Sequence, residues 1–196
     1  MNRRRVITVL GAAALIAVVV IGLISAGGSG PSSSPKSAAP SATQVSKELA
    51  GAPAPLAALH NQANQLLPGG ASAFQKRLAE LRGHPVVVNK WASWCGPCRA
   101  EFPHFQQASV EHGKQVAFIG VDSSDNNGQA QAFLKKFPVS YPSYEDGDLK
   151  IAQKLNAVGA FPTTVYYDSK GRRVGEHIGV YQKASDLESD IKRYAQ

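Results

Sequence analysis

Short apolar runs alternate with amphipathic segments along the second half of the chain. The runs "PVVVNKW" (85–91) and "KQVAFIGVD" (114–122) are rich in β-branched residues and predict two buried strands. The segment between them has helical spacing from Cys95 to about His112. A strand, a helix and a strand in this order predict a βαβ unit, with parallel strands and a right-handed crossover.

The flanking segments extend this unit into a larger α/β pattern. Three further helices are expected, over residues 69–83, 128–137 and around 147–157. Residues 163–180 predict two strands joined by a turn at 169–171, and hence an antiparallel hairpin. Ser185 and Glu188 have the spacing of a capping box ahead of a last helix. The sequence therefore predicts an α/β fold with a central mixed sheet flanked by helices on both faces.

The first 25 residues predict a membrane anchor or a signal segment. Residues 6–25 are apolar and uncharged, follow three arginines at positions 3–5, and are long enough to cross a hydrocarbon core as a helix. The basic flank predicts that the rest of the chain faces away from the cytoplasm. An uncleaved single-pass anchor is expected, and cleavage near residues 25–27 with secretion is the alternative.

Composition divides the remainder into a linker and a domain. Residues 26–55 are dominated by Gly, Ser, Pro and Ala, which predicts a disordered linker, and residues 56–196 are expected to form one globular domain. The formal charge of +7 falls to +3 within that domain, where 16 Lys and Arg face 13 Asp and Glu. No basic block with interleaved aromatic residues is present, so nucleic-acid binding is not expected.

Both cysteines of the chain lie in one Cys-x-x-Cys motif, at Cys95 and Cys98. A zinc site is not expected, because the chain has no second cysteine pair and its histidines are scattered. Haem attachment would need a histidine after the second cysteine, where Arg99 stands. A purely structural bridge would close a loop too small to constrain the unfolded chain much. A redox-active dithiol, needing no other cofactor, is the interpretation that fits best.

The predicted position of the motif supports this interpretation. Cys95 is expected at the N-terminus of the helix, where free N–H groups and the helix dipole favour a thiolate. Pro97 suits the first helical turn, and Cys98 lies one turn further along the same face. Cys95 is therefore predicted to be the attacking thiol and Cys98 the resolving one.

The segment "WASWCGPCRAEFP" resembles the active-site segment of thioredoxin-fold proteins. With "VAFIGVD" and "AVGAFPTTVYYDSKGRRV", most of residues 66–196 is similar to the membrane-anchored TlpA/ResA/DsbE-like thiol-disulfide oxidoreductases. The resemblance implies a thioredoxin fold and disulfide exchange with exported proteins. It also implies that Pro162 forms a cis peptide bond beside the dithiol and that Phe161, which precedes it, contributes to substrate binding. Core packing is the alternative role for Phe161.

The resemblance assigns Glu101 to proton transfer with the thiols, and a solvated charge paired with Arg99 or His104 is the alternative. Trp94 is expected to shield the cysteines and to contact substrates, with Gly96 and Pro97 supporting the site.

Three other positions near the motif can be compared with this family. Asn89 occupies the strand position where thioredoxin has an acidic residue, which leaves Glu101 as the expected proton carrier. Lys90 replaces an aromatic residue common in the family, and Trp91 is expected in the core.

The Gly-Pro dipeptide is that of thioredoxin, whose potential is about −270 mV, against about −120 mV for the strong oxidant DsbA. It therefore favours a reductant, for example in cytochrome c maturation. Such a protein would receive electrons from a membrane thiol carrier of the CcdA/DsbD type. The alternatives are a disulfide-forming oxidant coupled to a quinone-linked oxidase, a non-catalytic thioredoxin-like binding module, and a thiol peroxidase of related fold.

Overall fold

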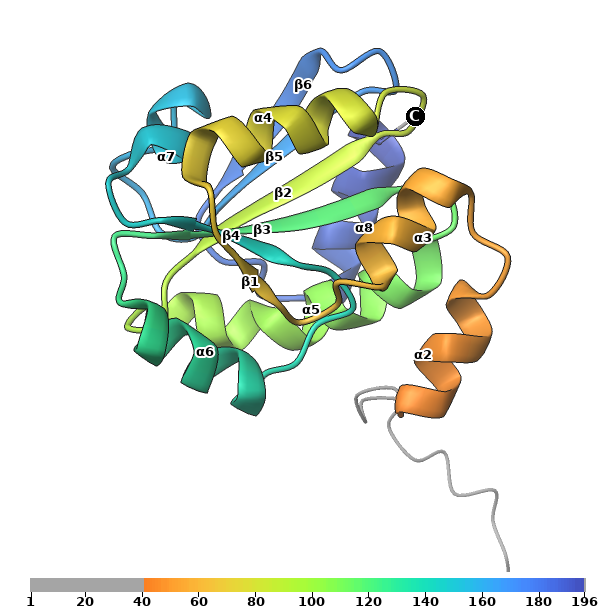
Figure 1. Cartoon of the computed structure of the whole chain (residues 1–196), viewed down its shortest axis with the longest axis horizontal. Helices are drawn as coiled ribbons and strands as arrows, with labels where there is room; N and C mark the ends of the chain where they lie inside the picture. Colours follow the sequence, from red (N-terminus) through yellow and green to blue (C-terminus); the bar gives the residue numbers. More distant parts are fainter. Residues whose placement is uncertain (1–40, 196) are drawn as a thin grey trace, which may run out of the picture. The chain divides into compact units, whose positions relative to one another are not determined.

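A six-stranded mixed sheet is the centre of the computed structural model, which describes residues 41–195 (Figure 1). The strand order is β1-β4-β3-β2-β5-β6. The strands are β1 (Leu66–Leu67), β2 (Val86–Trp91), β3 (Ala117–Ser123), β4 (Ser143–Asp146), β5 (Thr163–Tyr167) and β6 (Arg173–Ile178). The pairs β1–β4, β4–β3 and β3–β2 are parallel, whereas β2–β5 and β5–β6 are antiparallel.

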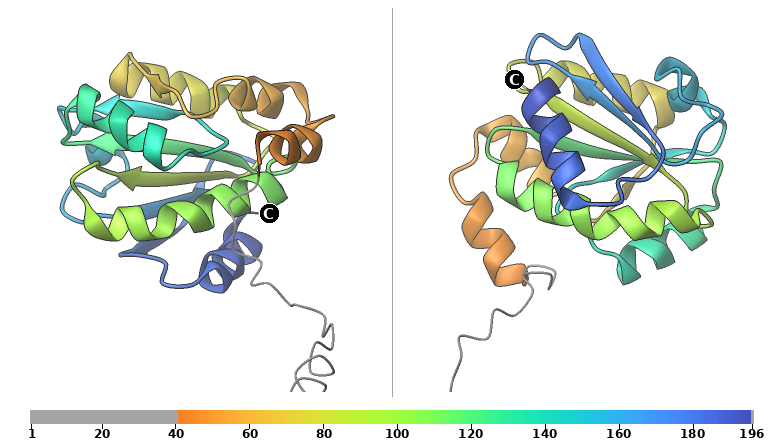
Figure 2. Two further views of the ribbon diagram at one scale, coloured as in Figure 1. Left: turned by 90° about the horizontal axis from the view of Figure 1, so that it is seen from below. Right: turned by 180° about the vertical axis from the view of Figure 1, so that it is seen from behind.

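Helices cover both faces of this sheet. They are α2 (Ala42–Leu49), α3 (Ala54–His60), α4 (Gly70–Glu80), α5 (Gly96–His112), α6 (Asn127–Lys136), α7 (Lys150–Lys154) and α8 (Ala184–Tyr194). The helices α5, α6 and α8 lie on one face, and α3, α4 and α7 lie on the other (Figures 1 and 2). The predicted α/β architecture of a mixed sheet between two helical layers is confirmed.

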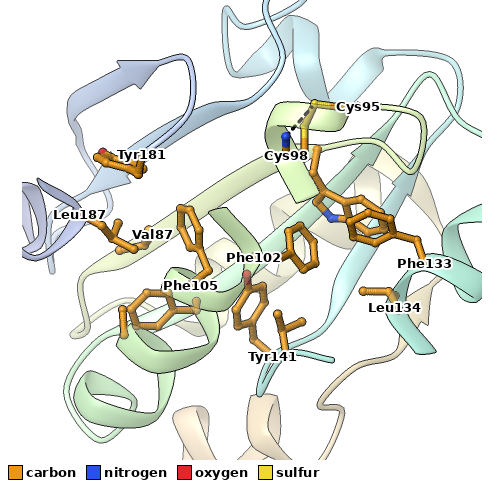
Figure 3. Packing of buried hydrophobic residues seen from close by; sticks show 14 of the residues in the cluster. Val87, Cys95, Cys98, Phe102, Phe105, Phe133, Leu134, Tyr141, Tyr181 and Leu187 are labelled. Atoms are coloured by element: carbon orange, nitrogen blue, oxygen red, sulfur yellow. Dashed lines mark hydrogen bonds between the residues drawn. A yellow bond between two sulfur atoms is a disulfide. The ribbon is translucent and has the colours of Figure 1, made fainter. Parts of the chain in front are cut away.

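Strand β2 is buried at all six positions and divides the apolar core into two clusters. Successive side chains of a strand point to opposite faces of the sheet. Val87 and Trp91 accordingly pack with the aromatic residues of α5 and α6. Figure 3 shows part of that cluster, with Val87 labelled. Val86 and Val88 pack in the second cluster, with the apolar residues of α3, α4 and α7. The β-branched run that predicted a buried strand therefore serves two cores at once.

The βαβ unit and the hairpin were predicted correctly. Strand β2 pairs with β3 in parallel from Val86↔Ala117 to Trp91↔Asp122, and α5 connects them. Strands β5 and β6 pair in antiparallel register around a turn at Gly171, whose φ of 76° suits a residue without a side chain.

Strands β1 and β4 were not predicted. Strand β1 has only two residues, and β4 has no apolar run. The sequence of β4 is Ser-Tyr-Glu-Asp, yet this strand lies inside the sheet between β1 and β3. Trp91 Nε1 donates to Ser143 Oγ at 3.1 Å, so the serine is satisfied within the core. Gly120 on β3 makes room for this pair, because a Cβ there would clash with the Ser143 side chain and lie 3.0 Å from Trp91 Nε1.

The predicted capping box at the last helix is wrong. Helix α8 has Lys183 as its N-cap, with no side-chain cap, and Ser185 lies inside the helix. Glu188 instead contacts His112 Nε2 at 2.8 Å, on the neighbouring helix α5. The Glu188 carboxylate thus binds His112 of α5 rather than the backbone at the start of α8, which the local sequence pattern had predicted.

The predicted disordered linker, residues 26–55, also needs correction in its second half. Residues 42–49 form α2, whose N-terminus has a capping box of Ser41 and Gln44. Leu49, at the end of α2, is buried against Gly113 at the end of α5, where a Cβ would lie 2.6 Å from Leu49 Cδ2. Leu49 thus packs this segment against the domain.

The predicted anchor or signal segment, residues 1–25, lies outside the described residues. Among residues 41–195, no helix combines the length and the apolar character needed to cross a membrane.

Candidate active site

The two cysteines lie where β2 gives way to α5. Strand β2 ends at Trp91, Cys95 is the N-cap residue, and α5 begins at Gly96 with Pro97 in its first turn. Cys98 donates its backbone N–H to Cys95 Sγ at 3.1 Å, as drawn in Figure 3. The predicted position of Cys95 at the helix N-terminus is confirmed. Its sulfur takes the place that a Ser or Asp oxygen occupies at many helix starts.

Cys95 and Cys98 form a disulfide, with their Cα atoms 5.3 Å apart. Cys98 is completely buried, and Cys95 is 3 % exposed. Gly96 and Pro97, between them, are exposed. Cys95 is therefore the sulfur that another protein could reach first, and Cys98 is placed to react only with Cys95.

The loop before Cys95 is held by the loop that follows β3. Ser93 donates its backbone N–H and its hydroxyl to the carboxylate of Asp125, the hydroxyl at 2.9 Å. Trp94 Nε1 donates to the backbone oxygen of Ser124 at 3.0 Å. Strands β2 and β3 are parallel, so both loops leave the sheet at the same edge. The sequence predicted a turn over residues 122–129. The predicted parallel pairing of β2 and β3 was the signal that could have placed this turn beside the cysteines.

Trp94 and Phe161 form an apolar rim at this edge of the sheet. Their ring centroids are 4.9 Å apart, Trp94 is 56 % exposed, and Phe161 is partly buried. The peptide bond between Phe161 and Pro162 is cis, as the family resemblance predicted. Phe161 packs against the cluster that contains both cysteines, so the rim and the disulfide belong to one contiguous region.

Glu101 is fully buried on α5, one turn beyond Cys98 on the same side of the helix. Its Oε1 accepts a hydrogen bond from Asn89 Nδ2 at 2.7 Å, and its Oε2 accepts one from the backbone N–H of Tyr181 at 3.1 Å. The sequence identified Glu101 and Asn89 but not Tyr181. A backbone donor 80 positions away leaves no trace in a side-chain pattern.

Burial is the main cause that raises the pKa of Glu101, from 4.5 to about 7. The hydrogen bonds from Tyr181 and Asn89 favour the carboxylate and oppose that rise. The alternative of a solvated charge paired with Arg99 or His104 is wrong, since the glutamate is inside the protein. A carboxyl group with a pKa near neutrality can both accept and release a proton at physiological pH.

Lys90 and Trp91 are the last two residues of β2, and both are completely buried. Trp91 is in the core as expected, packed against Phe102 and Phe133 of the cluster in Figure 3. Lys90 points to the opposite face of the sheet, and its Nζ lies 3.2 Å from the centroid of the Phe161 ring.

One side-chain group within residues 41–195 has ligand atoms close enough together to hold a metal ion. It consists of Glu111, His112 and Glu188, at the end of α5 away from the cysteines. At a rise of about 1.5 Å per residue, this end lies on the order of 24 Å from Cys95. The imidazole of His112 is already engaged by Glu188. This group is therefore separate from the site at the cysteines.

Comparison with known proteins agrees with this geometry. A family model described as Redoxin matches residues 37–191. The chain belongs to the Redoxin family. The match begins before α2, which supports including that helix in the Redoxin domain.

The relatives of this Redoxin-family chain have related names. It is 35 % identical over 103 residues to the thiol:disulfide interchange protein DsbE of Pseudomonas fluorescens biotype C, covering 52 % of this chain and 56 % of that protein. It is 30 % identical over 107 residues to the thiol-disulfide oxidoreductase ResA of Bacillus cereus, covering 54 % of this chain and 61 % of that protein. The chain thus spans somewhat more than half the length of these relatives.

Solved structures match the fold of this Redoxin-family domain. One is a secreted Mycobacterium tuberculosis disulfide oxidoreductase described as homologous to DsbE of E. coli. It has 26 % sequence identity and a TM-score of 0.53, and the match covers 59 % of this chain and 85 % of that one. The thioredoxin-like fold implied by the sequence resemblance is confirmed.

Proposed function

We propose that this protein is a thiol-disulfide oxidoreductase that exchanges the Cys95–Cys98 pair with disulfides and dithiols of exported proteins. The observation that carries the proposal is the disulfide itself, located at the N-cap of α5 with a backbone N–H directed at Cys95 Sγ. The same N–H and the helix dipole favour a negative charge on this sulfur in the reduced protein. The names of the DsbE and ResA relatives support the same activity.

In the reducing direction, the thiolate of Cys95 attacks one sulfur of a substrate disulfide. A mixed disulfide forms, and the other substrate sulfur leaves as a thiolate that takes up a proton. Cys98 then loses its proton and attacks Cys95 Sγ, which forms the internal disulfide and releases the second substrate sulfur. The substrate gains two electrons, and the protein loses two.

Glu101 is the group that we assign to the proton of Cys98. It lies one turn along the same helix, and its pKa of about 7 suits a group that accepts a proton from a thiol and later releases it. Asn89 and the N–H of Tyr181 hold its two oxygens in place. Asn89 cannot itself accept the proton at neutral pH.

The rim made by Trp94 and Phe161 would receive the substrate segment around its cysteine. Trp94 offers an exposed aromatic surface, and the backbone preceding Pro162 would pair with an extended substrate strand. Backbone pairing reads little side-chain information, which fits a protein that acts on several substrates.

We further propose that the protein works as a reductant outside the cytoplasm, for example in cytochrome c maturation. The Gly96-Pro97 dipeptide, the predicted anchor at residues 1–25 and the secreted M. tuberculosis relative support this direction and location. Electrons would then come from a membrane thiol carrier of the CcdA/DsbD type. If the anchor is cleaved, the same domain would act as a secreted protein.

Reduction of insulin disulfides tests the activity. The wild type should accelerate insulin precipitation in the presence of dithiothreitol, and Cys95→Ser should abolish the acceleration. Cys98→Ser should instead accumulate mixed disulfides, because the resolving thiol is missing. A wild type no faster than Cys95→Ser would contradict the proposal and favour the non-catalytic binding module, whereas peroxide consumption by the wild type would favour the peroxidase.

The reduction potential of the Cys95–Cys98 pair tests the direction. A value near about −270 mV is expected for a reductant, whereas a value near about −120 mV would show an oxidant.

A further inference from the structure

Lys90 is an unusual residue for the place that it occupies. It is completely buried on the central strand β2, where its register partners are Val121 on β3 and Thr163 on β5. Its Nζ has no hydrogen-bond acceptor within residues 41–195. Lysine is among the residues least often buried completely unless it is paired, because removing an ammonium group from water is costly.

The contact that Lys90 does make is with the rim of the candidate site. Its Nζ lies 3.2 Å from the centroid of the Phe161 ring, well within the range of a cation–π interaction. That ring in turn lies 4.9 Å from the ring of Trp94. A buried cation, a partly buried ring and an exposed ring are thus in consecutive contact, from the sheet to the rim.

The surroundings of Lys90 leave its charge directed at this ring. Asp146, at the end of β4, is the acidic group that attracts it, but the Asp146 carboxylate already accepts hydrogen bonds from Ser123 Oγ and from two N–H groups of α7. Burial, as the larger effect, lowers the pKa of Lys90 from 10.5 to about 8, so that the ammonium form still predominates at neutral pH. A leucine or methionine would fill the same space without this cost.

We propose that Lys90 is a positioning residue for substrate binding: its buried ammonium holds the Phe161 ring, and through it Trp94, as a preformed apolar rim for the substrate segment. This inference rests on the proposed function. The substrate segments that the rim fits are extended ones with an apolar or aromatic residue near the reacting cysteine. A rim fixed before binding needs less ordering when the substrate arrives, so Lys90 acts on affinity rather than on the chemistry of the sulfurs.

The test compares wild type, Lys90→Met, Phe161→Leu and the double variant, with Lys170→Met as a charge-matched control in the exposed turn of the hairpin. Reduction of insulin reports on the rim, and reduction of hydroxyethyl disulfide, which is too small to span the rim, reports on the thiols. For Lys90→Met we expect the KM for insulin to rise at least about threefold with little change in kcat. We expect no change with hydroxyethyl disulfide, and none in Lys170→Met.

The double variant decides whether the effect passes through the ring. If Lys90 acts on Phe161, adding Lys90→Met to Phe161→Leu should change the KM no further, because the π face is already gone. An additive effect, or an unchanged KM in Lys90→Met, would overturn the proposal. Equal changes with both substrates would also overturn it, since the charge would then act on the thiolate.

A spectrum gives a readout that does not depend on activity. In ¹H–¹⁵N spectra the indole signal of Trp94, whose ring packs on Phe161, should move in Lys90→Met, while that of Trp91, whose ring packs on Phe102 and Phe133 instead, should stay in place. Movement of both signals would indicate a general structural change and would contradict the proposal. Failure of the wild type to reduce either disulfide would count against the proposed function instead, and the spectrum would still test the contact.

Discussion

Glu101→Gln removes one titratable group from the core and leaves a side chain of the same shape. The amide can keep both contacts of the carboxylate, because its oxygen can accept from Tyr181 N–H. Its nitrogen can donate to Asn89 Oδ1 once the Asn89 amide has turned over. Asn89 Oδ1 is buried and has no hydrogen-bond partner within the described part of the chain. The substitution therefore tests the charge of Glu101 with little change in packing.

The magnitude follows from the shift in pKa. Raising the pKa of Glu101 from 4.5 to about 7 corresponds to about 3 kcal/mol, at about 1.4 kcal/mol per pKa unit. Between these two pH values the folded state binds more protons than the unfolded state. The wild type therefore has this contribution to stability in full below about pH 4.5 and loses it as the pH rises through 7.

Chemical denaturation of the oxidised proteins measures this effect. The free energy of unfolding of Glu101→Gln, minus that of the wild type, should increase by up to about 3 kcal/mol between pH 4 and pH 8. Glu111→Gln, an exposed position on the same helix, is the control and should show no comparable increase. A difference that is the same at both pH values would contradict this prediction, because it would mean that Glu101 titrates like a solvated acid.

The same variant should slow the chemistry. A positioned general base typically contributes 10²–10⁴-fold, so resolution of a mixed disulfide at pH 7 should be at least about 100-fold slower in Glu101→Gln. Rapid-mixing kinetics with a preformed mixed disulfide would measure this step. A rate equal to that of Glu111→Gln would remove Glu101 from the proton transfer.

Three further substitutions test other parts of the structure. Asp125→Ala removes the acceptor of both Ser93 contacts, so the unfolding free energy should fall by about 2 kcal/mol and amides near Ser93 should exchange faster; an unchanged exchange rate would contradict the loop contact. Lys90→Met should stabilise the protein by up to about 3 kcal/mol at pH 7. The wild type becomes more stable between about pH 8 and 10.5, because its buried lysine deprotonates there. The stability advantage of Lys90→Met over the wild type, measured by denaturation, should therefore be smaller at pH 10 than at pH 7, and an advantage that does not change with pH would contradict this. Gly113→Ala places a methyl group against the backbone oxygen of Ser109 and 2.6 Å from Leu49 Cδ2, so the protein should lose about 1–3 kcal/mol and α2 should become accessible to proteases; a protease resistance of α2 equal to that of the wild type would show that α2 does not pack there.

The parts of the fold that the sequence predicted are those with a continuous local pattern. The apolar run of β2, the helical spacing of α5 and the turn before β6 each depend on neighbouring residues. Strand β4 could not be recognised in this way, because Ser143 becomes acceptable in the core only through Trp91, which lies 52 positions away.

The same distinction between local patterns and contacts of distant segments applies to the candidate site. Cys95, Cys98 and Pro162 belong to short motifs and could be identified from the sequence alone. The donor from Tyr181, the carboxylate of Asp125 and the contact between Lys90 and Phe161 join segments that are distant in the chain. Lys90 illustrates the difference well. The sequence showed only that Lys90 departs from the family. The structure shows its contact, because it places the ammonium group over the Phe161 ring.

The reactivity of the two reduced cysteines shows whether Cys95 is the attacking thiol. Reduced protein would be exposed briefly to iodoacetamide at pH 6, and peptide mass spectrometry would measure the modification of each cysteine. We expect Cys95 to be alkylated much faster than Cys98, because the N-terminal N–H groups of α5 favour its thiolate and Cys98 is fully buried. Equal rates for the two sulfurs, or faster modification of Cys98, would contradict this expectation.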